Sequence, residues 1–156
     1  MTSATVPPEM ATAATATPPV APGSAPVRPA NVPALKVLLL DDQEDFRDIV
    51  RDYLISRFYK VTEVSNGADG LRAIMRESFD LILCDMRMPK VGGEMFYWAV
   101  TRVRPAARLR FVFITGYQND PKIEHFFRRI QATVLLKPFK LEELNRCLID
   151  VDRKLR

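Results

Sequence analysis

Three aspartates, a threonine and a lysine each come directly after a short run of apolar residues. Asp41 and Asp42 follow a leucine-rich run, and Asp85, Thr115 and Lys137 follow three later runs. Carboxylate oxygens bind Mg²⁺, a carboxylate can attack phosphorus, and hydroxyl and ammonium groups can stabilise charge on phosphoryl oxygens. Together, these residue types predict a site of metal-assisted phosphoryl transfer.

The site forms only if the fold brings these run ends together. Apolar runs indicate buried strands at 36–40, 60–64, 81–84, 110–114 and 133–136. Helical spacing of apolar residues predicts helices at 44–58, 68–77, 94–103, 121–130 and 141–155. This alternation indicates an α/β fold, a doubly wound five-stranded parallel sheet with five helices on its two faces. Ligands bind beyond the carboxyl ends of such strands, so the side chains should meet at one edge.

The motifs resemble those of the receiver domain of bacterial two-component response regulators. The resemblance covers the chain from Leu35 onwards. It is carried by Asp41-Asp42, the stretch 85–89 with Gly93 after it, Thr115-Gly116, and the stretch 137–139. It implies the flavodoxin-like (CheY-like) strand order 2-1-3-4-5, which the sequence pattern does not reveal.

The same resemblance implies a role for each acidic residue. Asp85 is the expected nucleophile and becomes an acyl phosphate. Mg²⁺ is the expected cofactor, bound directly by Asp42 and Asp85, through water by Asp41, and by the backbone oxygen of Arg87. Without the resemblance, Asp41 and Asp42 could equally cap the following helix, a role that is compatible with metal binding.

The resemblance also implies which groups contact the phosphoryl oxygens. They are the ammonium group of Lys137, the hydroxyl of Thr115 and the backbone N–H of Gly116, with a cis peptide bond before Pro138. Asp85, Thr115 and Lys137 are thus the expected catalytic residues, and they act only on the protein's own phosphorylation and dephosphorylation.

Departures from the family pattern affect the expected conformational switch. Val134 stands where receivers usually carry an aromatic residue, and Gln131-Ala132 replaces a glycine-containing turn. We therefore expect Thr115 and Tyr117, rather than Val134, to move on phosphorylation. Arg87 and Tyr117 also flank the site, where their side chains either shield the acyl phosphate from water or point to solvent.

The first 33 residues differ in composition from the rest of the 156-residue chain. They hold eight of the twelve prolines, no aromatic residue, and only Glu9 and Arg28 as charged side chains. Such a segment cannot bury enough apolar surface to offset its ordering entropy. We expect 1–33 to be a disordered or polyproline-II tail, either passive or partner-binding, and 34–156 to be the receiver domain.

Composition also bears on location and partners. The net charge of +4 is modest, and arginines clustered within 102–110 are interpreted as a solvated connection, so no direct nucleic-acid partner is expected. No signal peptide or membrane span is visible. Cys84 and Cys147 lack metal-ligand spacing and indicate a reducing compartment. We expect a cytoplasmic protein that does not bind membranes.

Two aromatic positions outside the motifs invite other interpretations. Trp98 and Met95 fall off the core face that Phe96 and Val100 define. Trp98 either anchors a partner or packs into the core after a small shift of the helix. His125 lacks metal-like neighbours and is expected to be a surface residue rather than a phosphodonor.

These features predict a stand-alone response regulator without an output domain. It would accept a phosphoryl group from a histidine kinase or histidine phosphotransfer protein and signal by protein–protein contact. A phosphorelay intermediate or phosphate sink is an alternative within this class, and a pseudo-receiver that never sees phosphate is one outside it. An aspartate-nucleophile phosphatase would need an acid two residues after Asp85, where this chain has Arg87.

Overall fold

The computed structural model describes residues 33–116 and 119–156. The predicted tail lies outside these residues except for Pro33, and Tyr117 lies outside them too. The strands are β1 (Lys36–Leu40), β2 (Lys60–Val64), β3 (Leu81–Asp85), β4 (Phe111–Thr115) and β5 (Thr133–Leu136). The helices are α1 (Glu44–Ser56), α2 (Gly67–Arg76), α3 (Gly93–Val103), α4 (Pro121–Ile130) and α5 (Leu141–Leu155), with a 3₁₀ helix, η1 (Pro105–Arg110), before β4.

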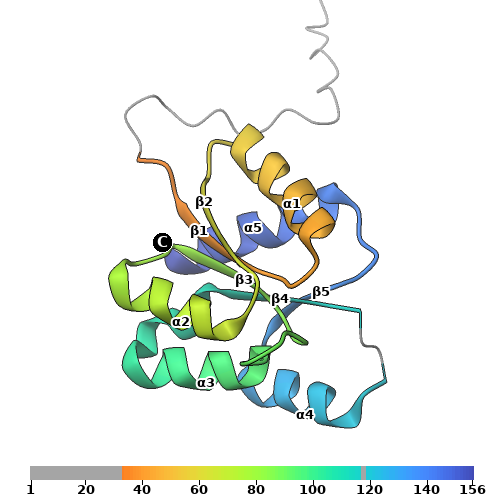
Figure 1. The fold of residues 1–156 in the computed structure, drawn as a ribbon. Helices are drawn as coiled ribbons and strands as arrows, with labels where there is room; N and C mark the ends of the chain where they lie inside the picture. Colours follow the sequence, from red (N-terminus) through yellow and green to blue (C-terminus); the bar gives the residue numbers. More distant parts are fainter. Residues whose placement is uncertain (1–32, 117–118) are drawn as a thin grey trace, which may run out of the picture.

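The five strands form one parallel sheet in the order β2-β1-β3-β4-β5, which confirms the predicted order (Figure 1). Each strand is joined to the next by a helix, as parallel pairing requires. The α1 and α5 helices pack on one face of the sheet, and α2, α3 and α4 pack on the other. The strands are apolar along their length because both of their faces are buried.

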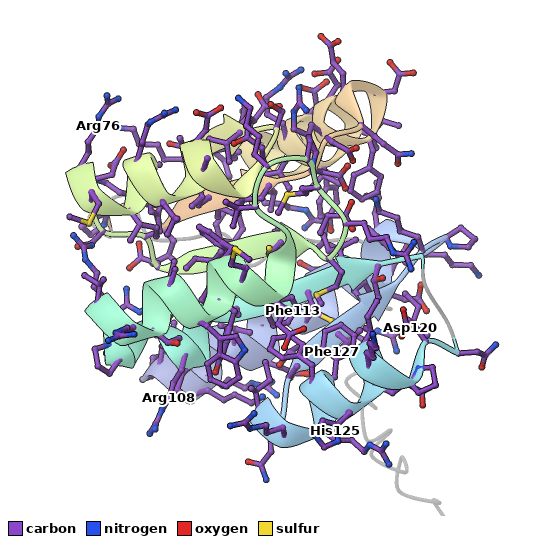
Figure 2. All side chains as sticks on the ribbon, turned by 60° about the horizontal axis from the view of Figure 1, so that its bottom comes forward. Arg76, Arg108, Phe113, Asp120, His125 and Phe127 are labelled. Atoms are coloured by element: carbon purple, nitrogen blue, oxygen red, sulfur yellow. The ribbon has the colours of Figure 1, made fainter. Side chains whose placement is uncertain are left out.

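The two faces of the sheet are packed with different side chains. On the α1 and α5 side the core is aliphatic, with Leu39, Leu83 and Ile114 contributed by the central strands. On the other side aromatic rings gather around Phe113, and the ring centroids of Phe113 and Phe126 are 5.5 Å apart. Figure 2 shows Phe113 and Phe127 between α3 and α4.

The segment before β4 differs from the prediction. It forms the helix η1. Two arginines, Arg104 directly before this helix and Arg110 at its end, bind backbone carbonyls. Arg104 Nη1 donates to the carbonyl oxygen of Glu77 at 3.0 Å, and Arg110 Nη1 donates to that of Phe79. The expectation of a solvated arginine cluster is therefore wrong for these two residues, because they tie η1 to the segment before β3. The other two, Arg102 and Arg108, are exposed as expected.

The expectations for residues outside the motifs agree with the structure in most respects. Phe96 and Val100 are fully buried, whereas the Trp98 side chain is 39% exposed. Trp98 therefore does not enter the core by a helix shift. His125 is exposed, and Cys84 is buried within β3. Among the described residues, no helix has the length and apolar character needed to cross a bilayer.

Candidate functional site

The predicted site residues meet at the carboxyl edge of the sheet. Asp41 follows β1, Asp85 ends β3, Thr115 ends β4 and Lys137 follows β5. Side chains from positions almost a hundred residues apart thereby become neighbours. This edge is where open parallel sheets bind ligands.

Three carboxylates gather at this edge. Oxygen atoms of Asp41, Asp42 and Asp85 all lie within 4.8 Å of one another. Asp41 is 1% exposed and Asp85 6%, whereas Asp42 is open to solvent. Carboxylates at this spacing repel one another, and a hard divalent cation relieves that repulsion with the oxygen ligands it prefers. The donor set and its open side therefore fit Mg²⁺, held by these three residues.

Lys137 partly offsets the negative charge of the carboxylates. Its Nζ lies 2.7 Å from Asp41 Oδ2 and 3.7 Å from Asp85 Oδ2. The side chain passes over the ring of Phe46, with Nζ 4.1 Å from the ring centroid, and Phe139 packs edge-on against that ring. The Lys137–Pro138 peptide bond is cis, as the resemblance implied. The contacts with Phe46, Asp41 and Asp85 hold the ammonium group at the acid cluster.

The surroundings of Asp85 keep its carboxyl group weakly acidic. Burial raises the pKa of Asp85 to about 6, and the negative charge of Asp41 acts in the same direction. Lys137 and backbone N–H groups lower this pKa but do not cancel the effect. One of these groups is the N–H of Arg87, whose nitrogen lies 3.4 Å from Asp85 Oδ1. A bound cation would favour the ionised form.

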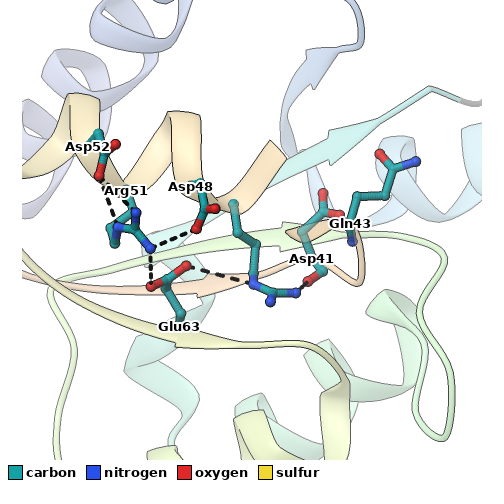
Figure 3. A network of polar contacts seen from close by, with 7 residues as sticks. Asp41, Gln43, Asp48, Arg51, Asp52 and Glu63 are labelled. Carbon is teal, nitrogen blue, oxygen red and sulfur yellow. Dashed lines mark hydrogen bonds and ion pairs between the residues drawn. The ribbon is translucent and has the colours of Figure 1, made fainter. Parts of the chain in front are cut away.

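A polar network holds Asp41 in place (Figure 3). Asp41 Oδ1 accepts a hydrogen bond from the backbone N–H of Gln43, and its carbonyl oxygen accepts one from Arg47. Arg47 also approaches Glu63 of β2, which pairs with Arg51 of α1. Gln43, the residue that precedes α1, has no side-chain cap. Neither aspartate caps α1, so both carboxylates face the site instead.

Thr115 and Gly116 lie on the far side of Asp85 from β1. Thr115 is fully buried, and its carbonyl oxygen accepts a hydrogen bond of 2.8 Å from the backbone N–H of Lys137. This bond joins the ends of β4 and β5 beside the site. Gly116 is exposed, and a β-carbon there would lie 3.9 Å from Cβ of Lys137, in ordinary contact. The lysine therefore leaves enough room for a β-carbon at this position.

The loop after Asp85 needs a glycine at position 93 for a steric reason. A β-carbon at Gly93 would lie 2.5 Å from the carbonyl oxygen of Asp85 and 2.9 Å from Cα of Met86. The Gly93 N–H donates to the carbonyl oxygen of Met86 at 3.0 Å. The start of α3 therefore packs directly against the backbone of Asp85, where only a residue without a side chain fits.

The sequence did not reveal an ion pair across the site entrance. The guanidinium of exposed Arg87 lies 3.4 Å from Asp120, the residue whose side chain caps α4. This pair connects the loop after β3 to the start of α4. The acid–base pairing could be anticipated from charge alone, but the two positions are 33 residues apart, and only the fold makes them neighbours.

The switch candidates are only partly described by the structure. Val134 is half-buried in β5 and packs against the aromatic face of the core. Thr115 lies beside the site as predicted, whereas Tyr117 lies outside the described residues. The predicted movement of Thr115 and Tyr117 therefore stays a prediction.

Sequence comparisons connect this site to known proteins. The family model described as "Response regulator receiver domain" matches residues 37–148. The response regulator receiver protein CpdR of Brucella abortus is 32% identical over 109 residues, which are 70% of this chain and 89% of CpdR. The transcriptional regulatory protein RprY of Bacteroides fragilis is 28% identical, and the match spans 78% of this chain but only 51% of RprY.

Solved structures show the same similarity in three dimensions. The chemotaxis response regulator CheY4 of Vibrio cholerae superposes with a TM-score of 0.67 at 28% identity, over 76% of this chain and 98% of that one. The receiver domain of the sensor histidine kinase PA1611 of Pseudomonas aeruginosa superposes with a TM-score of 0.67 at 27% identity. The match covers 74% of this chain and 94% of that one. That structure has a magnesium ion in its active-site cleft. With the family match, the strand order and the acid cluster in agreement, this chain belongs to the receiver-domain family of two-component response regulators.

Proposed function

We propose that this protein is a phosphoacceptor response regulator that is phosphorylated on Asp85. The phosphoryl donor is the phosphohistidine of a histidine kinase or of a histidine phosphotransfer protein. The phosphorylated protein then signals by contact with another protein. The observation that carries the proposal is the position of Asp85, a nearly buried carboxylate with Asp41 on one side and Lys137 3.7 Å away.

Each residue of the site has a task in this reaction. A carboxylate oxygen of Asp85 attacks phosphorus, the bond between phosphorus and the donor histidine nitrogen breaks, and the imidazole leaves with a proton from solvent. Lys137 leaves its pairing with Asp41 to bind a phosphoryl oxygen. The Thr115 hydroxyl and the Gly116 N–H would donate to the same group. Positioning and charge stabilisation account for most of the catalysis.

Mg²⁺ is the cofactor of this proposal. It would be held by Asp41, Asp42, Asp85 and the backbone oxygen of Arg87, and it supplies positive charge that neutralises the phosphoryl oxygens. The residues themselves place two carboxylates beside the nucleophile. Without a divalent cation these carboxylates repel the incoming phosphate, so phosphorylation should require one.

Phosphorylation with a small donor tests the proposal. The full-length protein is treated with acetyl phosphate and Mg²⁺, and intact mass is measured for wild type, Asp85→Asn and Asp150→Asn. Asp150 is an exposed aspartate on α5, so its substitution matches the chemical change without touching the site. We expect a hydroxylamine-labile phosphoryl adduct on wild type and Asp150→Asn only. Equal modification of Asp85→Asn would refute the assignment.

The output signal is proposed to arise at the start of α4. Thr115 would move toward the phosphoryl group and Tyr117 would reorient, because Val134 is too short to fill the space that Thr115 leaves. The charge-assisted bond from Thr115 would contribute about 1.5–3 kcal/mol to the difference between the two states. The ion pair between Arg87 and Asp120 supports this route, because it links the phosphoacceptor loop to α4.

Beryllofluoride, a stable phosphoryl mimic, tests this route by NMR. We expect the largest shift changes in residues 116–120 and at the start of α4, and a weaker response in Thr115→Ala. Largest changes at Val134 and α5 with Tyr117 unchanged would contradict the route.

Two further functions differ from this one in a measurable way. A phosphorelay intermediate or phosphate sink would pass the phosphoryl group on or lose it without binding an output partner. A pseudo-receiver would fail to bind Mg²⁺, which calorimetry detects directly. A cytoplasmic location belongs to the proposal, because histidine kinases and phosphotransfer proteins would supply the phosphoryl group there, and the two free cysteines are compatible with it.

A further inference from the structure

A second pocket lies at the amino edge of the sheet, opposite the phosphoacceptor site. It has a volume of about 430 Å³ and lies where β4 and β5 begin. Phe111 is the first residue of β4, Tyr97 comes from the middle of α3, and Ile130 is the last residue of α4. Figure 2 shows Arg108 at the rim of the molecule beside α3, with Phe113 farther in between α3 and α4.

The walls of this pocket combine aromatic rings with cations. Tyr97 packs edge-on against Phe111, with ring centroids 5.0 Å apart, and the rings of Phe111 and Phe113 are stacked. Small side chains, including Ala132, leave the space between α4 and η1 unfilled. The lining thus offers aromatic surface together with several polar and charged groups that could orient a ligand.

The cations of the pocket have no acidic partners. Arg108 on η1 and Lys154 in the last turn of α5 line it, and no acidic residue does. Within the part of the chain that the structure describes, no carboxylate forms an ion pair with either cation. The Lys154 side chain forms one hydrogen bond there, a long one of 3.4 Å to the hydroxyl of Thr133. From Met95 to Asn119 the sequence contains no acidic residue. The pocket therefore has uncompensated positive charge.

Tyr97 adds a polar group to the lining of the pocket. The residue is 6% exposed, and no hydrogen bond to its hydroxyl forms among the described residues. Burial raises the pKa of Tyr97 further above neutral pH, where the hydroxyl is protonated in any case and can donate. A hydroxyl that reaches the open space of the pocket can donate a hydrogen bond to an acceptor bound there.

We propose that this pocket binds a small aromatic anion, a planar ring that carries a carboxylate or a phosphate. The ring would lie against Phe111 and Tyr97, and the anionic group would lie between Arg108 and Lys154. The C-terminal end of α4 closes the other side, where its partial negative charge disfavours an anion. The anionic group of the ligand is therefore expected beside Arg108 of η1 and Lys154 of α5. This site does not depend on phosphorylation of Asp85.

Naphthalene probes test the proposal with the full-length protein. 2-Naphthoate, 2-naphthyl phosphate and the neutral 2-naphthalenemethanol are titrated to about 5 mM, a weak-binding limit, with ¹⁵N NMR detection. We expect the two anions to shift the signals of Tyr97, Arg108 and Thr133, and to bind more tightly than the alcohol. Comparing the two anions decides between carboxylate and phosphate. No binding by either, or shifts confined to the Asp85 edge, would overturn the proposal.

Matched variants separate specific from general charge effects. Arg108→Gln should weaken binding of the preferred anion about tenfold and leave the alcohol unchanged. Arg102→Gln removes the same charge from exposed α3 outside the pocket, so its affinity should equal wild type. Ala132→Leu fills the pocket and should abolish binding of all three probes. Equal losses in Arg108→Gln and Arg102→Gln, or wild-type binding by a folded Ala132→Leu, would refute the site.

Discussion

The two edges of the sheet use charged side chains in opposite ways. At the carboxyl edge, Asp41, Asp42 and Asp85 lie close together, with Lys137 as the cation beside Asp41 and Asp85. At the amino edge, Arg104 and Arg110 donate to backbone carbonyls of the segment before β3. The first arrangement concentrates like charges, and the second satisfies polar backbone groups.

This difference indicates that the carboxyl edge, which holds the candidate site, is the less stable of the two edges. Like charges held together disfavour the folded state unless a ligand compensates them. Arginines that donate to part-buried carbonyls stabilise the fold, because a carbonyl left unpaired there would be costly. We therefore expect removal of charge at the carboxyl edge to stabilise the metal-free protein and to remove its activity. Removal of Arg104 or Arg110 at the amino edge should destabilise the protein and leave its activity intact.

The largest expected change is in Asp85→Asn. The pKa of Asp85 is raised to about 6 in the folded state, so ionisation at neutral pH opposes folding. Without divalent cations at pH 7.5, the variant should be more stable by about 1–3 kcal/mol. Lowering the pH through 6 toward 4 protonates Asp85 in the folded wild type, and the difference should disappear. Urea denaturation at both pH values measures it.

Asp80→Asn is the matched control for that prediction. Asp80 lies at the amino edge, where its carboxylate accepts the backbone N–H of Lys36 at 2.8 Å. Its neutral amide should not stabilise the protein at pH 7.5. A pH-independent gain in Asp85→Asn, or an equal gain in Asp80→Asn, would show that repulsion at the carboxyl edge is not the cause.

Arg110→Met should have the opposite effect. The methionine keeps much of the aliphatic packing but leaves the carbonyl of Phe79 without its donor. We expect a loss of about 1–2 kcal/mol in unfolding free energy with unchanged Mg²⁺ affinity. Arg102→Met, at an exposed position on α3, should cost little. Unchanged stability in Arg110→Met would remove the distinction between the two edges.

Mg²⁺ affinity should depend on pH in the range where Asp85 titrates. Protons and Mg²⁺ compete for the same carboxylate, so affinity should fall about tenfold between pH 7 and pH 5. Calorimetric titration of the wild type measures this. In Asp85→Asn the residual affinity should be weak and should lack this pH dependence. A wild-type affinity that is constant over this range would show that Asp85 does not bind the metal.

Removing residues 1–33 should have the smallest effect. Their composition provides no core, so neither edge should lose packing. Thermal melts of the full-length and shortened proteins should agree within about 2–3 °C, which is less than about 1 kcal/mol. Phosphorylation with acetyl phosphate should be unaffected. A larger loss of stability would mean that this segment packs on the domain.

The sequence by itself determined the strands, most helices and the acid, hydroxyl and lysine set at the strand ends. These features are local, because buried parallel strands are continuous apolar runs and the residue after each run lies at one edge. The strand order and the role of each site residue came from family resemblance. His125 is exposed as expected, whereas helical spacing left open whether Trp98 enters the core, and the structure shows it 39% exposed.

Only the tertiary structure decided which residues of distant segments contact one another. The carbonyl contacts of Arg104 and Arg110, the ion pair of Arg87 with Asp120, and the pocket under Tyr97 all join residues from separate elements. The residues around an arginine that binds a part-buried carbonyl do not differ in pattern from those around a solvated arginine. Its partner is set by how the elements pack, which the periodicity of a single segment does not encode.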